Sequence, residues 1–344
     1  MAFIVGGRFR QPPTSASVLF LCCSVMLLVG CGMRPDGAST AARRSDTIRV
    51  VATTGMVADL VRAVGGDHVS VDQVIGAGVD PHLYQPSRDD VALVMSGDLV
   101  FYSGLMLEGK LADTLIRIGS DKPVVAVTEN IDEAFLLQSD RAGGHADPHV
   151  WMDVSAWSRC VDVVAGTLSE HDPARAEDYA RHAKAYQAEL AALHRYGLER
   201  LATVPKESRI LITSHDAFHY FGKAYDLEVR GIQGLSTESE AGLQRINELV
   251  DLLVEKQIKA VFTESSVSDK NVMALIEGAA SKGVVIDLGG VLFSDAMGAK
   301  GTYEGTYIGM LDHNITTVTR SLGGEAPVGG MNGSLTSAAE APHS

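Results

Sequence analysis

The chain has 344 residues, which exceeds the usual size of one hydrophobic core, so we expect two domains of roughly 150 residues each. Hydrophobic residues make up 46% and charged residues 21%, a globular composition that excludes a mostly disordered chain. The formal net charge of −14 repels phosphate backbones. Nucleic acid is therefore not an expected partner, and a cation is favoured instead.

The N-terminal segment has the features of an export signal. Arg8 and Arg10 precede an apolar run, ASVLFLCCSVMLLVG, over residues 16–30. As a helix this run falls short of a bilayer core of roughly 30 Å, so a permanent transmembrane helix is the poorer interpretation, and a buried helix is another alternative. The run ends in LVGC, which resembles the lipobox of bacterial lipoproteins. This resemblance implies that residues 1–30 are a signal peptide and that Cys31 is lipidated, which would anchor an exported protein to the outer face of the cell membrane.

Two further segments are low in apolar periodicity. Residues 31–46 and residues 322–344 are rich in Gly, Ser, Ala and Pro. Such composition predicts a flexible tether behind the lipid anchor and a disordered C-terminal tail.

Short β-branched runs alternate with helical patterns in two stretches of the chain. The runs span residues 48–54, 69–75, 98–104, 123–127, 209–214, 227–232, 260–265 and 284–288. This alternation is typical of βα units and predicts an α/β fold with mainly parallel sheets in two lobes, residues 47–172 and 205–321.

Residues 173–204 separate the two stretches. They are rich in Ala, Glu, Arg and Leu, with apolar residues near helical spacing, and they begin at Pro173 and stop before Pro205. We expect one long helix here. Such a helix resists bending, so it would join the lobes rigidly.

Four side chains that could bind a metal follow predicted strands. Asp-Pro-His occurs twice, ending at His82 and His149, and His215 and Asp295 follow strands of the second lobe. Proline stiffens each tripeptide, although two unrelated surface loops would give the same sequence. Open α/β sheets place their sites beyond the carboxyl ends of strands. Imidazole and carboxylate ligands suit zinc, manganese or iron.

Four further carboxylates lie near these candidates. Each could orient an imidazole by accepting its outer N–H, and each could instead cap a turn. They are Asp80, Asp147, Asp153 and Glu264.

Six motifs together carry a family resemblance. They are VDPHLYQPSRDD, DPHVWMDVSAW, ITSHDAFHYF, VRGIQGLSTESEAG, VFTESSV and LFSDAMG, in this order. The chain thus resembles the substrate-binding lipoproteins of bacterial manganese and zinc ABC importers, the cluster A-I metal receptors. The resemblance implies two lobes, a rigid connecting helix and one metal ion in the cleft between them, bound by His82, His149, His215 and Asp295. Glu264 is the alternative fourth ligand.

The resemblance also implies how the protein works. A non-enzymatic, monomeric receptor would capture zinc or manganese, or iron, and deliver it to an ABC permease with its ATPase. The His-rich loop of many zinc receptors is absent, since residues 138–146 contain only His145, and many manganese receptors have Glu where His215 stands. Metal identity therefore stays open.

Two other classes of function compete with a receptor. His215-Asp216-Ala217-Phe218-His219 has the histidine spacing of a zincin, with Asp216 where the general base would stand. A lipid-anchored adhesin is the second alternative.

Overall fold

A computed structural model describes residues 47–138 and 144–335. The predicted signal peptide, Cys31 and the predicted tether up to residue 46 lie outside these residues. In the ranges that the structure describes, none of the helices combines the length and apolar character that a bilayer crossing needs.

The first lobe is built on a parallel sheet of four strands in the order β2-β1-β3-β4. Alternate residues of β1 serve two cores, because Val50 packs with α1 while Val51 packs on the opposite face with Val94 and Leu115 of α2 and α3. The elements are β1 Ile48–Ala52, α1 Gly55–Gly65, η1 Gly66–His68, β2 Val69–Gln73, α2 Arg88–Ser96, β3 Leu99–Tyr102, η2 Gly109–Leu111, α3 Ala112–Ile118 and β4 Val124–Ala126.

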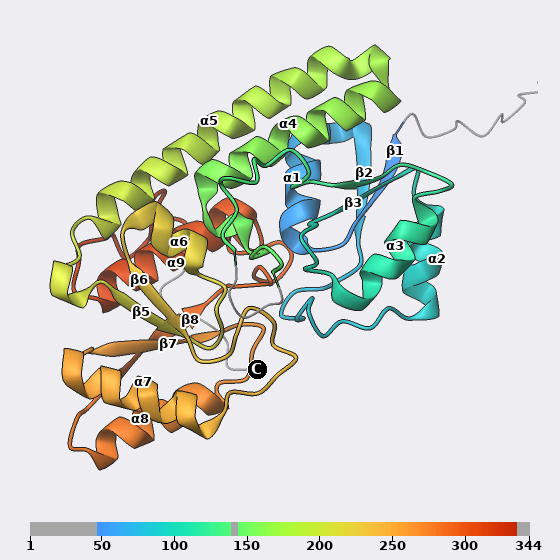
Figure 1. The fold of residues 1–344 in the computed structure, drawn as a ribbon. Coiled ribbons are helices and arrows are strands. Elements are labelled where there is room, and N and C mark those ends of the chain that lie inside the picture. The colour runs from blue at the N-terminus through green and yellow to red at the C-terminus, as the bar shows by residue number, and fades with distance from the viewer. Residues whose placement is uncertain (1–46, 139–143, 336–344) are drawn as a thin grey trace, which may run out of the picture. The chain divides into compact units, whose positions relative to one another are not determined.

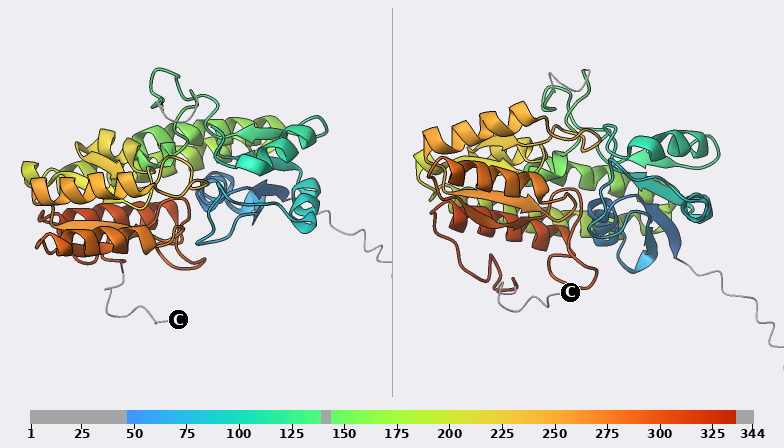
Figure 2. Two further views of the ribbon diagram at one scale, coloured as in Figure 1. Left: turned by 60° about the horizontal axis from the view of Figure 1, so that its bottom comes forward. Right: turned by 90° about the horizontal axis from the view of Figure 1, so that it is seen from below.

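The second lobe contains two parallel strand pairs, β5-β6 and β7-β8, with β5 beside β7. Helices α7 and α8 pack on one face and α6 and α9 on the other (Figure 1; Figure 2). Buried apolar residues on both faces are typical of such a sheet. The elements are η5 Lys206–Ser208, β5 Ile210–Thr213, α6 His219–Tyr225, β6 Glu228–Gly231, α7 Leu243–Lys256, β7 Ala260–Glu264, α8 Lys270–Ser281, β8 Asp287–Leu292 and α9 Tyr307–Ser321.

The lobes are joined by a pair of helices. The pair consists of α4 Val154–His171 and α5 Ala176–Leu201, with η3 Val150–Met152 before α4 and the turn η4 Pro173–Arg175 between them. Helix α5 contacts α1 of the first lobe and α6 and α9 of the second (Figure 1). Its buried face repeats at helical spacing through Tyr179, Ala183, Tyr186 and Leu190. The expected long helix is present, and α4 lies alongside it as a second helix that the sequence analysis did not predict.

Strand β8 begins three residues later than the predicted run of residues 284–288. Gly283 ends α8 with a φ of +80°, and the N–H of Val284 bonds back to the carbonyl of Ala279 at 3.0 Å, so the start of the run caps the helix. The strand instead includes Gly289 and Gly290 at a register shift against β7. A Cβ on Gly289 would lie 2.6 Å from the ring of Phe262, so this position requires glycine.

The first part of the predicted disordered tail packs against the second lobe. Residues 322–335 are placed, and the N–H groups of Glu325 and Met331 donate to Thr203 Oγ1 at 2.7 Å and Asp312 Oδ1 at 2.9 Å. The carboxylate of Asp312 is fully buried and must find donors, which this segment supplies. The prediction of disorder from composition is therefore wrong for these residues, and residues 336–344 lie outside the described part of the chain.

Candidate metal centre

Four side chains that are distant in sequence meet where the two lobes face each other. His82 follows β2, His149 precedes η3, His215 follows β5 and Asp295 follows β8. One ligand atom from each lies within 4.8 Å of all the others, and all four residues are buried. The structure thus brings together the four residues that the sequence predicts as ligands.

The distances within this group fit a tetrahedral ion. The Nε2 atoms of His149 and His215 lie 3.3 and 3.1 Å from the two carboxylate oxygens of Asp295, and the Nε2 atoms of His82 and His149 lie 3.3 Å apart. Metal bonds of about 2.0–2.1 Å in a tetrahedron place ligand atoms about 3.3–3.4 Å apart. These three contacts are close to that spacing, while His82 Nε2 lies 3.7 Å from Asp295 Oδ2, so the four residues surround a space for one ion of this size.

Buried polar atoms without hydrogen-bond partners in this group also indicate a bound cation. In the described residues, His215 Nε2 and both oxygens of Asp295 are buried and make no hydrogen bond of acceptable geometry. Buried polar atoms normally have a partner. A cation bound among the imidazole nitrogens and the carboxylate would supply it.

Two of the four predicted orienting carboxylates hold imidazoles. Asp147 Oδ1 accepts from Nδ1 of His149 at 2.7 Å, and Glu264 Oε2 accepts from Nδ1 of His215 at 2.5 Å. Each carboxylate also accepts the backbone N–H of its histidine at 2.9 Å. These contacts turn both Nε2 atoms toward Asp295. Glu264 therefore faces the outer nitrogen of His215, and it is Asp295 that lies among the Nε2 atoms.

The other two predicted orienting carboxylates act on the backbone instead. Asp80 accepts the backbone N–H of His82 at 2.8 Å and the hydroxyl of Thr237 at 2.5 Å. Asp153 caps α4, because its Oδ1 accepts from the N–H groups of Ser155 and Ala156. Neither binds an imidazole N–H, and the alternative expected for them, capping, is the contact that the structure shows. Free N–H groups at a turn and at a helix start lie nearer to these short side chains.

Comparison with known proteins identifies the family. The family model described as "Zinc-uptake complex component A periplasmic" matches residues 50–321. The chain belongs to this family. The manganese-binding lipoprotein MntA of Bacillus subtilis (strain 168) is 47% identical over 307 residues, which cover 89% of this chain and 98% of MntA.

Solved structures of the family have the same fold. The periplasmic zinc-binding protein TroA from Treponema pallidum superimposes with a TM-score of 0.78 at 41% identity, covering 80% of this chain and 99% of that chain. Fe(III)-bound YtgA from Chlamydia trachomatis gives a TM-score of 0.72 at 25% identity, covering 81% and 99%. The predicted resemblance to metal receptors and the predicted α/β fold are confirmed.

Burial and neighbouring carboxylates shift the pKa values of the three imidazoles in opposite directions. Burial lowers the pKa of His82 to about 4. Burial also opposes charge on His149, but Asp147 and then Asp295 outweigh it and raise the pKa of His149 to about 9. At His215 burial is outweighed in the same way by Glu264 and Asp295, which raise its pKa well above the ordinary value. Without metal, the carboxylates around His149 and His215 therefore favour the protonated form of both rings.

His215 and His219 do not have the arrangement of a zincin motif. Helix α6 begins at His219, so His215 lies outside it and the two histidines do not share a helical face. Nε2 of His215 faces Asp295, whereas Nε2 of His219 faces Asp216 at 3.5 Å. Neither His219 nor His145 belongs to the group of four, and His145 is exposed.

Sequence reasoning missed two aromatic residues that fix this centre. Trp151 Nε1 donates to the carbonyl of Ser294 at 2.9 Å, and Tyr307 Oη donates to the carbonyl of Trp151 at 2.7 Å. Both side chains are fully buried. These bonds connect the loop of His149 with the loop of Asp295. The position of Trp151, two residues after His149, was the available signal.

Proposed function

We propose that this protein is the extracytoplasmic substrate-binding component of an ABC importer and that it captures one divalent transition-metal ion. The observation that carries the proposal is the buried group of His82, His149, His215 and Asp295, whose ligand atoms lie within 4.8 Å of one another. The chain's membership of the zinc-uptake family supports it.

The donor set favours zinc or manganese, with iron as a third candidate. Three imidazole nitrogens and one carboxylate bind all three ions, and nitrogen-rich sites follow the Irving–Williams order in vitro. The names of relatives cover the same range: MntA is called manganese-binding, TroA zinc-binding, and YtgA was solved with Fe(III). Competition among metals supplied in the cell would select the cargo.

A receptor role fits this centre better than an enzymatic one. Four protein ligands close a tetrahedral site, whereas catalytic zinc sites usually have three protein ligands and one water. The metal is therefore cargo rather than a catalytic cofactor. We propose that a membrane permease and its ATPase receive it from a monomeric receptor.

Metal analysis tests this function. Protein purified without chelators should contain close to one divalent ion per chain, and His149→Ala should lose it. His145→Ala is the matched control, because His145 is exposed and lies outside the group, and it should keep the ion. Protein without metal affinity, or full metal content in His149→Ala, would exclude the proposal.

We further propose that residues 1–30 are removed as a signal peptide and that lipidated Cys31 holds the protein to the membrane through the tether 31–46. Replacing Cys31 with Ser should release the protein into the soluble fraction, because a thioether-linked lipid requires the thiol. Fractionation of cells in high salt measures this. A Cys31→Ser protein that stays with the membrane would show that the apolar run itself is the anchor.

A further inference from the structure

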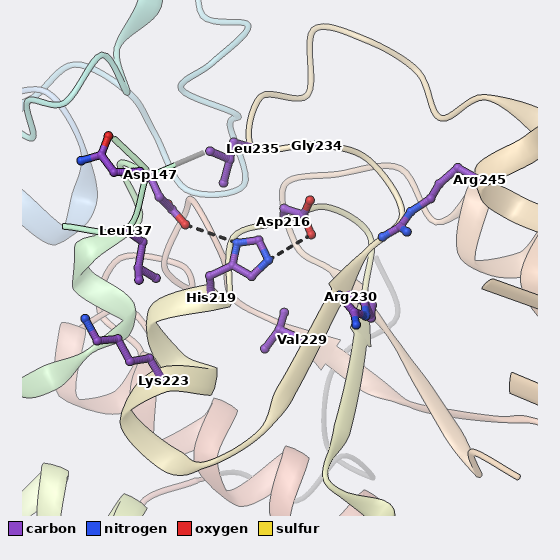
Figure 3. A pocket seen from close by; sticks show the side chains of 11 residues that line it. Leu137, Asp147, Asp216, His219, Lys223, Val229, Arg230, Gly234, Leu235 and Arg245 are labelled. Atoms are coloured by element: carbon purple, nitrogen blue, oxygen red, sulfur yellow. Dashed lines mark ion pairs between the residues drawn. The ribbon is translucent and has the colours of Figure 1, made fainter. Parts of the chain in front are cut away.

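His219 lies outside the group of four, and its imidazole stands between two carboxylates. Nδ1 of His219 lies 3.4 Å from Asp147 Oδ2, and Nε2 lies 3.5 Å from Asp216 Oδ1 (Figure 3). Because the two contacts use opposite nitrogens of one ring, the ring cannot turn toward one carboxylate without moving relative to the other. His219 therefore bridges Asp147 and Asp216.

Asp147 is the carboxylate that orients His149. Its Oδ1 is committed to Nδ1 and the backbone N–H of His149 at 2.7 and 2.9 Å. Its other oxygen, Oδ2, is buried and has no hydrogen bond of full geometric quality among the described residues. His219 is the neighbour of that second oxygen at 3.4 Å, and this contact is the main reason that the pKa of His219 is raised.

The far side of the imidazole is anchored to the sheet. Asp216 Oδ1 accepts the backbone N–H of Gly231, at the end of β6, at 2.7 Å. A Cβ on Gly231 would lie 2.5 Å from that oxygen, so β6 approaches Asp216 closely because this residue is glycine. A continuous series of contacts thus runs from β6 through Asp216, His219 and Asp147 to His149.

The imidazole of His219 can also be reached by solvent. It is 36% exposed and lines a cavity of about 520 Å³, whereas His149 is fully buried. The next residue, Tyr220, donates its hydroxyl to the carbonyl of Asp147 at 3.1 Å. Helix α6 therefore holds the Asp147 backbone with one residue and faces its carboxylate with another.

We propose that His219 is a positioning residue of the metal centre, which holds Asp147 so that Asp147 fixes the ring of His149 toward the metal. The inference rests on the proposed function, because it assigns His219 to the same centre. It also gives a role to Asp216 and His219, which belong to the zincin-like run of residues 215–219 in the sequence and face each other at 3.5 Å in the structure. Outer partners of metal-binding histidines commonly change affinity by about 10–100-fold.

Three substitutions separate this role from simple packing. The amide nitrogen of Asn can replace Nδ1 and contact Asp147, whereas that of Gln replaces Nε2 and contacts Asp216. We expect His219→Ala and His219→Gln to weaken zinc binding about tenfold, the lower end of the range for outer partners, and His219→Asn to bind nearly as wild type. His68→Ala is the matched control, since His68 is 29% exposed and faces Asp178 at 3.1 Å in another part of the chain.

Competition titration with zinc and a chromogenic chelator measures these affinities. In an Asp147→Asn background His219→Ala should cause no further loss, because both residues act through one contact. Equal affinities for the Asn and Gln variants, wild-type affinity in His219→Ala, or a full additional tenfold loss in the double variant would each overturn the inference. If His219→Ala does not fold, the comparison of Asn with Gln still decides.

The same titration separates the two proposals. Wild-type protein that binds no zinc would remove the proposed function and this inference together. Wild-type binding that is lost in His149→Ala but unchanged in all three His219 variants would remove only the role of His219.

Discussion

At the residue scale, the four ligand candidates differ in how they hold protons. Burial favours the neutral ring of His82, while His149 and His215 each lie between two carboxylates that favour the charged ring. A metal ion binds only neutral imidazoles. Metal capture must therefore displace protons from His149 and His215.

This difference predicts the number of protons released. At pH 7 we expect His149, with a pKa of about 9, and His215, whose pKa is raised well above its ordinary value, to be charged, and His82, with a pKa of about 4, to be neutral. Binding one divalent ion should therefore release about two protons at pH 7. Release from His149 should fade as the pH rises through about 9, and affinity should fall as the pH drops.

Calorimetry in buffers of different ionisation enthalpy measures this release directly. A heat of zinc binding that does not depend on the buffer at pH 7 would contradict the assigned protonation. The His68→Ala protein should release the same number of protons as wild type, because His68 lies outside the centre.

The sequence located the four candidate ligands better than the contacts around them. Asp-Pro-His and the strand-end positions indicate candidate ligands by local rules, because proline and strand direction act over a few residues. Which carboxylate meets which imidazole depends on contacts between distant segments, as Glu264 and His215 show. Asp153 precedes a helix that was not predicted, so the sequence alone could not decide between capping and binding an imidazole.

At the element scale, the position of Asp295 depends on the irregular strand β8. The register against β7 shifts between Val261 and Phe262, which leaves Gly289 as an additional residue opposite the ring of Phe262. Such a bulge redirects the strand that follows it. Two consecutive glycines are more typical of a loop than of a strand. For this reason the sequence analysis placed the strand at residues 284–288, before the glycines.

Gly289→Ala tests this element. Its new Cβ would lie 2.6 Å from the Phe262 ring, so we expect a loss of about 1–3 kcal/mol of stability together with weaker metal binding. Gly76→Ala is the matched control, because a Cβ there meets nothing within 4 Å and the residue does not have a positive φ. Thermal unfolding and zinc titration of both variants measure the effect. An unchanged melting temperature in Gly289→Ala would contradict this role of the bulge.

At the scale of the whole molecule, several bonds hold the two lobes together. Asp59 of α1 accepts the N–H of Tyr307, the first residue of α9, at 3.0 Å, and Tyr186 of α5 donates to the same carboxylate at 3.3 Å. The bond from Trp151 to Ser294 adds a third connection beside the centre. The apolar core that includes α1, α5 and α9 is continuous across both lobes. Large hinge opening would have to break these contacts.

We therefore expect metal binding to move the lobes by only a few degrees, in contrast to receptors with flexible loop hinges. Small-angle scattering of metal-free and metal-loaded protein measures the radius of gyration of each form. The two values should agree closely, while the melting temperature should rise with metal because the ion binds the folded state. A contraction comparable with that of large-hinge receptors would contradict the rigid connection.

Diffraction from metal-loaded crystals at the absorption edge of the metal tests the central claim most directly, because the anomalous signal locates the ion itself. One peak per chain is expected, about 2.0–2.2 Å from Nε2 of His82, His149 and His215 and from a carboxylate oxygen of Asp295. A peak beside His219 and Asp216, two peaks of similar height, or a peak without Asp295 among its neighbours would contradict the account.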